Sequence, residues 1–430
     1  IEGNKNHPSS LGATNPIVQA SILDLYDPDR SKLIKNKGKR SSWKKVSEEL
    51  KMIDKKRIAV LSHSFSSPSI HKIKKSLEEQ GISWYCYDPI SDENELEGIK
   101  RAYNKDAFAN YSISDADRIL SLDSDFLNVD ANPIKNTKDF SRKRKVVSQK
   151  NAKMNRLYVV EGNLTTTGAM ADHRKRLKQS EINEFVYKIW DRFKGNESSD
   201  NFINAVYKDL KGNKGLIKGG SRLSPECHEL IVRMNHRLGK NGVKYIPFSK
   251  TNACPSNSGK YKKLIEKMKN EDIDCLCVLD SNPIYFSKNK DGFKEAFKSI
   301  GTSIHFGSYY DETASESDWH IPKTHYLESW GDCESLDGAV SIIQPLISPL
   351  YSQAYSDLDF LQFLKDFDNS KNIKPMDAAY KIIKEEYASS WTKSLHNGIV
   401  KTLKYNEISD APRAKEIKPK KSSAGNEVVF

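Results

Sequence analysis

The sequence predicts an α/β protein built on parallel sheets and divided into two lobes. Short apolar runs, such as residues 58–61 and 118–122, alternate with segments whose apolar residues recur at helical spacing. This alternation is typical of strands joined by crossover helices, which form parallel sheets. Polar residues follow several of these runs directly, and parallel sheets bind ligands at the carboxyl ends of their strands.

The first 180 residues supply an entry segment and the first predicted lobe. Residues 1–55 contain loop signals and a helix at 42–50, for which Ser42 can serve as the N-cap. Residues 56–180 form the first lobe, with strands expected at 57–61, 82–87, 118–122 and 156–160 and a helix at 69–80. We expect the loops 62–67, 123–125 and 161–167, which follow three of these strands, to meet in one cleft.

The remaining residues supply a second lobe and segments of other kinds. Residues 181–212 are expected to form a helical linker. Residues 213–318 form the second lobe, with strands expected at 215–217, 243–248, 273–279 and 302–306. Residues 319–410 are expected to form a loop-rich clasp with helices, because Pro, Gly and aromatic residues are frequent at 319–350. Residues 411–430 are expected to form a basic linker, and we expect the chain to continue beyond both ends.

Composition restricts the class of protein. The chain has 430 residues, which at about 150 residues per domain suggests two to three domains. Its 69 Lys and Arg residues exceed its 57 Asp and Glu residues, giving a net charge of +12. The basic residues alternate with acidic ones and are not interleaved with aromatics, so we expect no nucleic-acid partner. The sequence contains no run of eighteen apolar residues, so we expect no membrane span.

The six cysteines favour buried thiols over a metal site. The closest pair is Cys275 and Cys277, inside the apolar run 273–279. Residues two apart on a strand share a face, so both side chains can lie in the core. Iron–sulfur and zinc sites usually show a C-x2-C pair, which this segment lacks. We therefore predict no metal site here.

Three polar motifs contain residue types that can bind metals or act in catalysis. Asp123 and Asp125 could bind a metal, share acid and base roles, or cap the next turn, and capping is favoured. His320 and His325 lack the H-E-x-x-H spacing of a zinc helix, and Pro322 between them indicates a loop. Ser64 follows His63 directly without a G-x-S-x-G turn, which argues against a nucleophilic serine.

Several stretches together resemble the molybdopterin oxidoreductase superfamily, whose fold contains two Rossmann-like parallel-sheet lobes. They are residues 116–122, 157–173, 224–238, 280–283 and 311–320. A closer resemblance is to the large subunit of bacterial alternative complex III, in which a molybdopterin-enzyme-like half is fused to a ferredoxin-like half. It is carried by residues 1–8, 20–30, 122–127, 171–174, 325–332 and 344–351.

The resemblance implies a place in a membrane-associated respiratory complex that oxidises quinol. It implies iron–sulfur clusters in a C-terminal half beyond Phe430, and a peripheral position on the periplasmic face of the bacterial inner membrane. The implied partners are other subunits of that complex, including a multihaem cytochrome and quinol-binding membrane subunits.

The departures from the superfamily pattern predict a domain without its cofactor. Active members have a glycine-bearing turn where this chain has Asp123-Ser124-Asp125-Phe126, and two carboxylates there would repel a pterin diphosphate. Glu161-Gly162-Asn163 likewise replaces an Asp-Pro-Arg-like stretch. We therefore expect a cofactor-free scaffold in which molybdopterin is absent and no residue is catalytic.

The residues expected to mark the remnant of the pterin cleft are Ser64, Ser66, Asp123, Asp125, Glu161, Asp172, Asn282, Thr313, His320, His325 and Glu328. The alternative is an active molybdenum bis-pterin oxidoreductase, such as a polysulfide or thiosulfate reductase-like enzyme. In that case Ser64 or Ser66 would ligate the metal, and Asn282, Thr313 and His325 would hold the pterin. On the scaffold hypothesis, substituting His320 or Glu328 should reduce assembly of the complex and leave turnover of the assembled complex unchanged.

Overall fold

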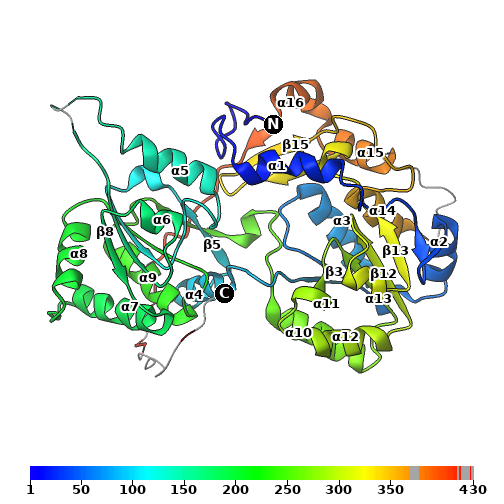
Figure 1. Ribbon diagram of the computed structural model, residues 1–430, viewed down its shortest axis with the longest axis horizontal. Coiled ribbons are helices and arrows are strands. Elements are labelled where there is room, and N and C mark those ends of the chain that lie inside the picture. The colour runs from blue at the N-terminus through cyan, green and yellow to red at the C-terminus, as the bar shows by residue number, and fades with distance from the viewer. Residues whose placement is uncertain (149, 151, 368–376, 414–415, 418–426, 428–430) are drawn as a thin grey trace. The chain divides into compact units, whose positions relative to one another are not determined.

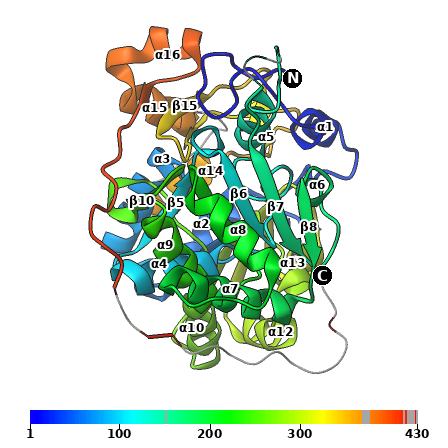
Figure 2. The same ribbon diagram turned by 90° about the vertical axis from the view of Figure 1, so that its left-hand side faces the viewer.

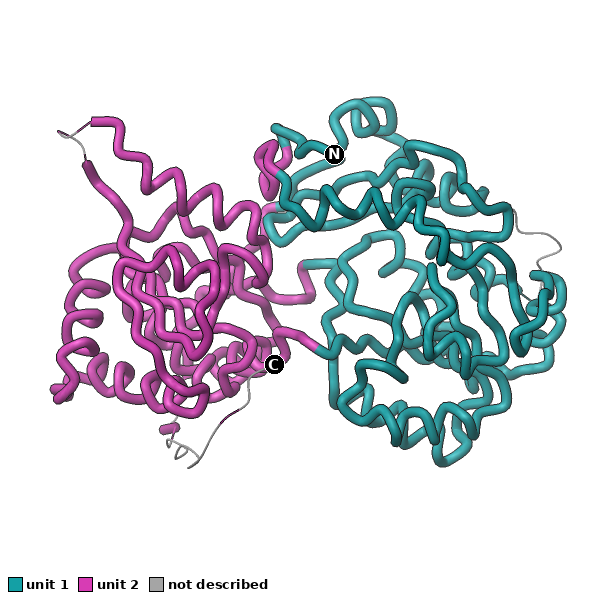
Figure 3. The backbone as a smooth tube through the Cα atoms, in the orientation of Figure 1, with its two compact units in different colours: residues 1–6, 14–89, 251–403 teal, residues 7–13, 90–250, 404–430 magenta. Residues whose placement is uncertain are grey.

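The computed structural model describes residues 1–148, 150, 152–367, 377–413, 416–417 and 427. The chain forms two compact units, and neither is continuous in sequence (Figure 3). Unit 1 contains residues 1–6, 14–89 and 251–403, and unit 2 contains residues 7–13, 90–250 and 404–430. Among the described residues, no helix is long and apolar enough to cross a membrane.

Unit 1 contains a seven-stranded sheet in the order β2-β1-β13-β12-β11-β3-β4 (Figure 1). Five neighbouring strands are parallel: β13 (Trp319–Pro322), β12 (Thr302–Gly307), β11 (Cys275–Leu279), β3 (Ile58–Ser62) and β4 (Ser83–Cys86). The short strands β1 (Lys35–Asn36) and β2 (Lys39–Arg40) extend the β13 edge in antiparallel fashion. The predicted α/β class is confirmed.

Both faces of this sheet are buried, because successive strand residues point to opposite faces. Val60 and Cys277 belong to the core cluster that includes residues of α2 (Trp43–Leu50), α3 (Pro68–Glu79), α14 (Asp357–Asp366) and α15 (Asp377–Glu386). Leu61 and Val278 belong to the cluster formed with α10 (Ser258–Lys269), α11 (Pro283–Phe286) and α12 (Lys290–Ser299). Cys275 and Cys277 are buried free thiols on one face of β11, as the sequence predicted.

Unit 1 also carries smaller elements around the sheet. A three-stranded antiparallel sheet is formed by β14 (Gly331–Glu334), β15 (Ala339–Ile343) and β16 (Lys401–Thr402). The remaining helices of the unit are α1 (Pro16–Leu25), α13 (Glu312–Glu316) and α16 (Trp391–Asn397).

Unit 2 contains a four-stranded parallel sheet in the order β8-β7-β6-β9 (Figure 2). Its strands are β6 (Arg118–Leu122), β7 (Arg156–Glu161), β8 (His173–Arg176) and β9 (Gly215–Gly219). One face packs on α7 (Gln179–Lys194), α8 (Asn201–Lys211) and α9 (Pro225–Arg237). The other face packs against α4 (Glu93–Tyr103), α5 (Pro133–Arg142) and an antiparallel pair, β5 (Ala107–Tyr111) and β10 (Val243–Pro247). The short helix α6 (Thr166–Ala169) follows β7.

The predicted continuous lobes at 56–180 and 213–318 differ from the observed sheets. Strand β3 of the first predicted lobe pairs with β11 of the second, and β6 of the first pairs with β9 of the second. The connection between two parallel strands needs a dozen or more residues, and this connection can be much longer. Residues 90–250 are one such crossover, and the crossover is itself a folded unit.

Other departures have local causes. The predicted linker 181–212 forms α7 and α8, whose apolar faces lie in the core of unit 2. The predicted clasp contains β13, β14 and β15; Pro322 is tolerated because it is the last residue of its strand. The prediction missed α4 and β5, and it missed that β10 is antiparallel. The predicted linker 411–430 lies largely outside the described residues.

Candidate functional site

The two carboxylates after β6 are held by internal bonds of unit 2. Asp123 has a left-handed backbone, with φ of 55°, and its carboxylate accepts hydrogen bonds from Arg222 at 2.9 and 2.6 Å. Its side chain is fully buried, and this burial raises the pKa of Asp123 despite the opposing Arg222 charge. Asp125 accepts bonds from the backbone N–H and hydroxyl of Thr167 at 2.9 and 2.7 Å. Neither carboxylate caps the turn that follows β6: Asp125 bonds to the first turn of α6, and Asp123 forms an ion pair.

Glu161, the last residue of β7, and Asp172, the residue before β8, are also held by internal bonds, although Asp172 lies at the amino ends of these parallel strands. The buried Glu161 carboxylate accepts bonds from Arg174 Nε at 2.5 Å and Thr165 Oγ1 at 2.7 Å. Asp172 accepts two bonds from the Arg144 guanidinium, at 2.8 and 2.6 Å. A Cβ added at Gly168 would lie 1.8 Å from Glu161 Oε1, so the space beside this glycine is filled by the protein itself.

The three loops that were predicted to meet in one cleft follow strands of two different sheets. The loop 62–67 ends a strand of the sheet in unit 1, whereas 123–125 and 161–167 end strands of the sheet in unit 2. The three strands were predicted to be neighbours in one sheet. They belong to two sheets, because residues 90–250 form a separate folded unit within the chain.

Unit 1 has a cavity of about 130 Å³ at the carboxyl ends of β3, β11 and β12. The residues that line it are His63, Asp280, Ser281, Asn282, Phe286, His305, Gly307, Ser308, Tyr309 and Asp311. The 62–67 loop and Asn282 were predicted to lie at strand ends. His305 and Asp311 were not predicted as site residues. The signal that could have found Asp311 is its position after the apolar strand 302–306.

Two side chains that line this cavity are held by polar partners outside it. His63 Nδ1 lies 2.7 Å from Asp88 Oδ1. Asp280 also has a left-handed backbone, with φ of 48°, and it accepts a bond from Lys323 Nζ at 2.7 Å. Lys323 reaches Asp357 at 3.1 Å as well. Burial alone would lower the pKa of Lys323, but these two carboxylates outweigh it and raise that pKa.

The buried His305 lines the cavity, and the buried His320 contacts it from behind. The Nδ1 atoms of His305 and His320 lie 3.0 Å apart and the rings are stacked with centroids 5.2 Å apart. His305 Nε2 is 3.6 Å from Asp311 Oδ1, longer than a hydrogen bond, and His320 Nε2 is 2.7 Å from Ser31 Oγ. Burial lowers the pKa of both rings, that of His320 to about 3. Both imidazoles are therefore neutral near pH 7 and supply no positive charge for an anion.

The remaining candidate residues of unit 1 serve local structure. Thr313 donates from its backbone N–H and hydroxyl to Asn282 Oδ1, at 3.2 and 2.8 Å, so the sequence correctly brought these two together. Ser64 donates its backbone N–H to Asp88, and Ser66 Oγ lies 3.6 Å from Cys333 Sγ.

His325 and Glu328 are a cap and not part of the cavity lining. They form a reciprocal capping box around the short 3₁₀ helix Tyr326–Glu328. Glu328 is also paired with Arg30 at 2.6 Å, with both side chains almost fully buried. This buried ion pair attaches the predicted clasp, through Glu328, to Arg30 of the entry segment.

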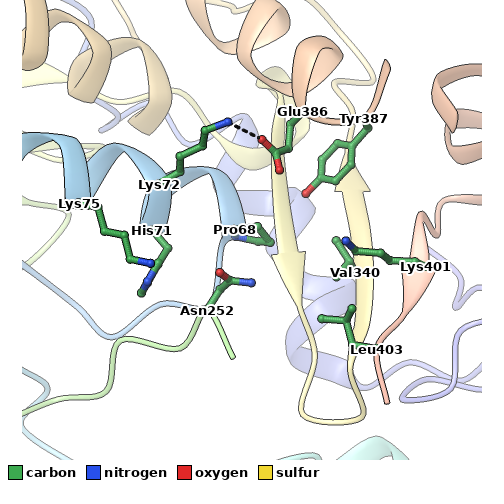
Figure 4. A pocket seen from close by; sticks show the side chains of 10 residues that line it. All are labelled: Pro68, His71, Lys72, Lys75, Asn252, Val340, Glu386, Tyr387, Lys401 and Leu403. Atoms are coloured by element: carbon green, nitrogen blue, oxygen red, sulfur yellow. Dashed lines mark hydrogen bonds and ion pairs between the residues drawn. The ribbon is translucent and has the colours of Figure 1, made fainter. Parts of the chain in front are cut away.

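A second cavity of unit 1, of about 300 Å³, lies between α3, β15, α15 and β16 (Figure 4). The residues that line it are Pro68, His71, Lys72, Lys75, Asn252, Val340, Glu386, Tyr387, Lys401 and Leu403. Lys72 is paired with Glu386 at 3.0 Å, and burial lowers the pKa of His71. With three lysines against one glutamate, the lining suits an anionic group. This cavity could not be predicted from the sequence because its residues come from five separate segments.

Comparison with known proteins places this fold. No protein-family model and no curated protein matches the chain. Among solved structures, the chain is similar to acetylene hydratase from Pelobacter acetylenicus, a molybdopterin enzyme, with a TM-score of 0.67 and 12% identity over 89% of this chain and 68% of that chain. It is also similar to the formyltransferase/hydrolase complex FhcABCD from Methylorubrum extorquens, with a TM-score of 0.53 and 11% identity over 82% of this chain and 99% of that chain.

These similarities define the class of fold. The protein has a molybdopterin-enzyme-like α/β fold, as the sequence resemblance implied. Neither structure points to alternative complex III, so that finer assignment stays a prediction. The second structure is a multi-subunit complex.

The residues at the strand ends do not fit a pterin diphosphate. Such a group needs backbone N–H donors, close glycine backbone and positive charge. In unit 2 the corresponding positions carry the carboxylates of Asp123 and Glu161, which already occupy Arg222 and Arg174. In unit 1 the backbone at Gly307 is covered by the ring of His305, since a Cβ there would lie 2.5 Å from the ring.

Proposed function

We propose that this chain is a cofactor-free, molybdopterin-enzyme-like scaffold domain of a membrane-associated quinol-oxidising electron-transfer complex of the alternative complex III type. Its role would be to hold partner subunits and a ferredoxin-like half, so that their redox centres lie within electron-transfer range. The proposed partners include a multihaem cytochrome and quinol-binding membrane subunits, and the proposed location is the periplasmic face of the bacterial inner membrane.

The observation that carries the proposal is the internal closure of the strand ends. In an α/β fold these ends are where ligands bind. Here Asp123, Asp125 and Glu161 each bond to a side chain or backbone of their own unit. Opening the site at Asp123 or Glu161 for a cofactor would leave a buried carboxylate and its cation without partners, which costs several kcal/mol.

The active-enzyme alternative requires a metal ligand from the 62–67 loop. Ser66 Oγ faces a thiol, and Ser64 is fixed through its backbone N–H to Asp88. These observations favour the scaffold over the enzyme.

A substitution in the cavity of unit 1 distinguishes the two functions. We expect His63→Ala to leave quinol-oxidation turnover per assembled complex within about twofold of wild type, because His63 is a half-exposed wall residue whose side-chain hydrogen bond is to Asp88. The measurement is quinol-dependent reduction of an electron acceptor by the purified complex, normalised to the amount of this subunit. Lys44→Met, on the exposed face of α2, is the matched control. A tenfold or larger loss of turnover in a normally assembled His63→Ala complex would contradict the scaffold function.

A further inference from the structure

The thiols of Cys86 and Cys254 face one another in unit 1. Their Sγ atoms lie 2.9 Å apart although the residues are 168 positions apart in sequence. Both are free cysteines in this structure, Cys86 buried and Cys254 partly exposed. A disulfide needs an Sγ–Sγ distance of about 2.0 Å, so a shift of about 1 Å would bring the two atoms to bonding distance.

Backbone hydrogen bonds on both sides hold the two residues in place. Cys254 exchanges two backbone bonds with Phe65, of 2.8 and 3.2 Å. The carbonyl of Cys86 accepts a bond from the N–H of Asn257 at 2.9 Å, and the N–H of Asp88 donates to Ser256 Oγ at 3.0 Å. The segment that carries Cys254 is therefore fixed against the end of β4, and the sulfur atoms can meet without unfolding either segment.

The two thiols differ in reactivity. The contact with the Cys86 thiol, together with the charges of Lys74 and Lys260, lowers the pKa of Cys254 against the effect of its burial. The same contact and burial raise the pKa of Cys86. Cys254 is the more exposed of the two and has the larger thiolate fraction, which suits it to react first.

We infer that Cys86 and Cys254 are a disulfide-forming pair that covalently links two segments of unit 1. The chain leaves unit 1 after residue 89 and returns at residue 251, so the bond would join unit 1 just before and just after this excursion. This inference is independent of the proposed function, because it rests on the geometry of unit 1 alone.

The reaction is a thiol–disulfide exchange with a small-molecule disulfide such as oxidised glutathione. The Cys254 thiolate attacks one glutathione sulfur, forming a mixed disulfide and releasing one glutathione thiolate. Cys86 then loses its proton to solvent and attacks Cys254 Sγ, which releases the second glutathione thiolate. Two protein thiols are oxidised and one disulfide is reduced to two thiols.

Peptide mapping of the whole chain tests the inference. The protein is equilibrated with oxidised glutathione or with dithiothreitol, denatured, alkylated with iodoacetamide and digested. We expect alkylatable thiols to fall from six to four in the oxidised sample, with a cross-linked peptide pair containing Cys86 and Cys254. We expect Cys333→Ser, which removes an exposed thiol, to form the same cross-link. Full alkylation of both residues after oxidation, or a stable glutathione adduct on Cys254, would overturn the inference.

Thermal unfolding supplies a second readout. Closing a loop of this length restricts the unfolded chain, so the oxidised wild type should unfold on the order of 5 °C or more above the reduced form. Cys254→Ser should remove this difference between oxidised and reduced samples. A difference that persists in Cys254→Ser would count against the pair, since the remaining thiols would then account for it.

Discussion

Arg30→Met is expected to lower the stability of unit 1 by about 3–5 kcal/mol. Arg30 and Glu328 form an ion pair at 2.6 Å with side chains that are 2% and 0% exposed. Arg30 also donates to the carbonyl of Leu25 at 2.7 Å. Methionine fills much of the same volume but leaves the Glu328 carboxylate buried without its cation. The measurement is the free energy of unfolding of unit 1, followed by urea titration and by hydrogen exchange of β3 and β11 amides.

A double-mutant cycle separates the lost pair from the lost packing. Glu328→Gln combined with Arg30→Met removes both charges, so the double variant should be more stable than the sum of the two single effects by about 2 kcal/mol or more. Lys44→Met is the surface control: its pair with Glu48 is largely exposed and should contribute less than about 0.5 kcal/mol. Additive effects of the two buried substitutions would show that the pair is not coupled, contrary to the geometry.

Gly220→Ala is expected to destabilise unit 2 by about 3 kcal/mol or more. Gly220 follows β9, and a Cβ at this position would lie 1.7 Å from the carbonyl oxygen of Asp123 and 2.5 Å from its carbonyl carbon. These are backbone atoms, so no side-chain rotation can relieve the overlap. The strand-end turn that holds Asp123 against Arg222 must therefore move.

Hydrogen exchange shows whether the effect is local to unit 2. Amides of β6 and β9 should lose protection in Gly220→Ala, while amides of β3 and β11 should keep theirs. Gly301→Ala is the matched control, because its nearest neighbour would be the Asp274 carbonyl at 3.5 Å, an ordinary contact. Unchanged protection of β6 and β9 would contradict the close packing inferred at the end of β9.

Much of the fold could be predicted from sequence because its strands are strongly apolar on both faces. Strands β3, β6, β7, β11 and β12 all lie where their apolar runs predicted them. The assignment of these strands to two sheets could not be predicted, since apolar runs carry no information about which parallel strand is the neighbour. Strand β5 was missed because Ala107, Ala109 and Asn110 weaken its apolar signal.

The candidate site was predictable only in part. Asp123 and Asn282 follow the apolar strands β6 and β11, and of the two only Asn282 lines the cavity of unit 1. Their partners could not be predicted from the sequence. Arg222 lies 99 residues from Asp123 in the chain, and no local pattern joins them. The contact between Cys86 and Cys254 was hidden for the same reason, because a whole folded unit separates them in sequence.

If the strand ends are closed and this domain works without a pterin, the full-length protein purified with its native partners should contain iron but neither molybdenum nor pterin. Metal analysis and pterin fluorescence of that preparation measure all three. Molybdenum near one and pterin near two per chain would mean that the ion pairs at Asp123 and Glu161 open to admit the cofactor, and the cofactor-free function would be wrong.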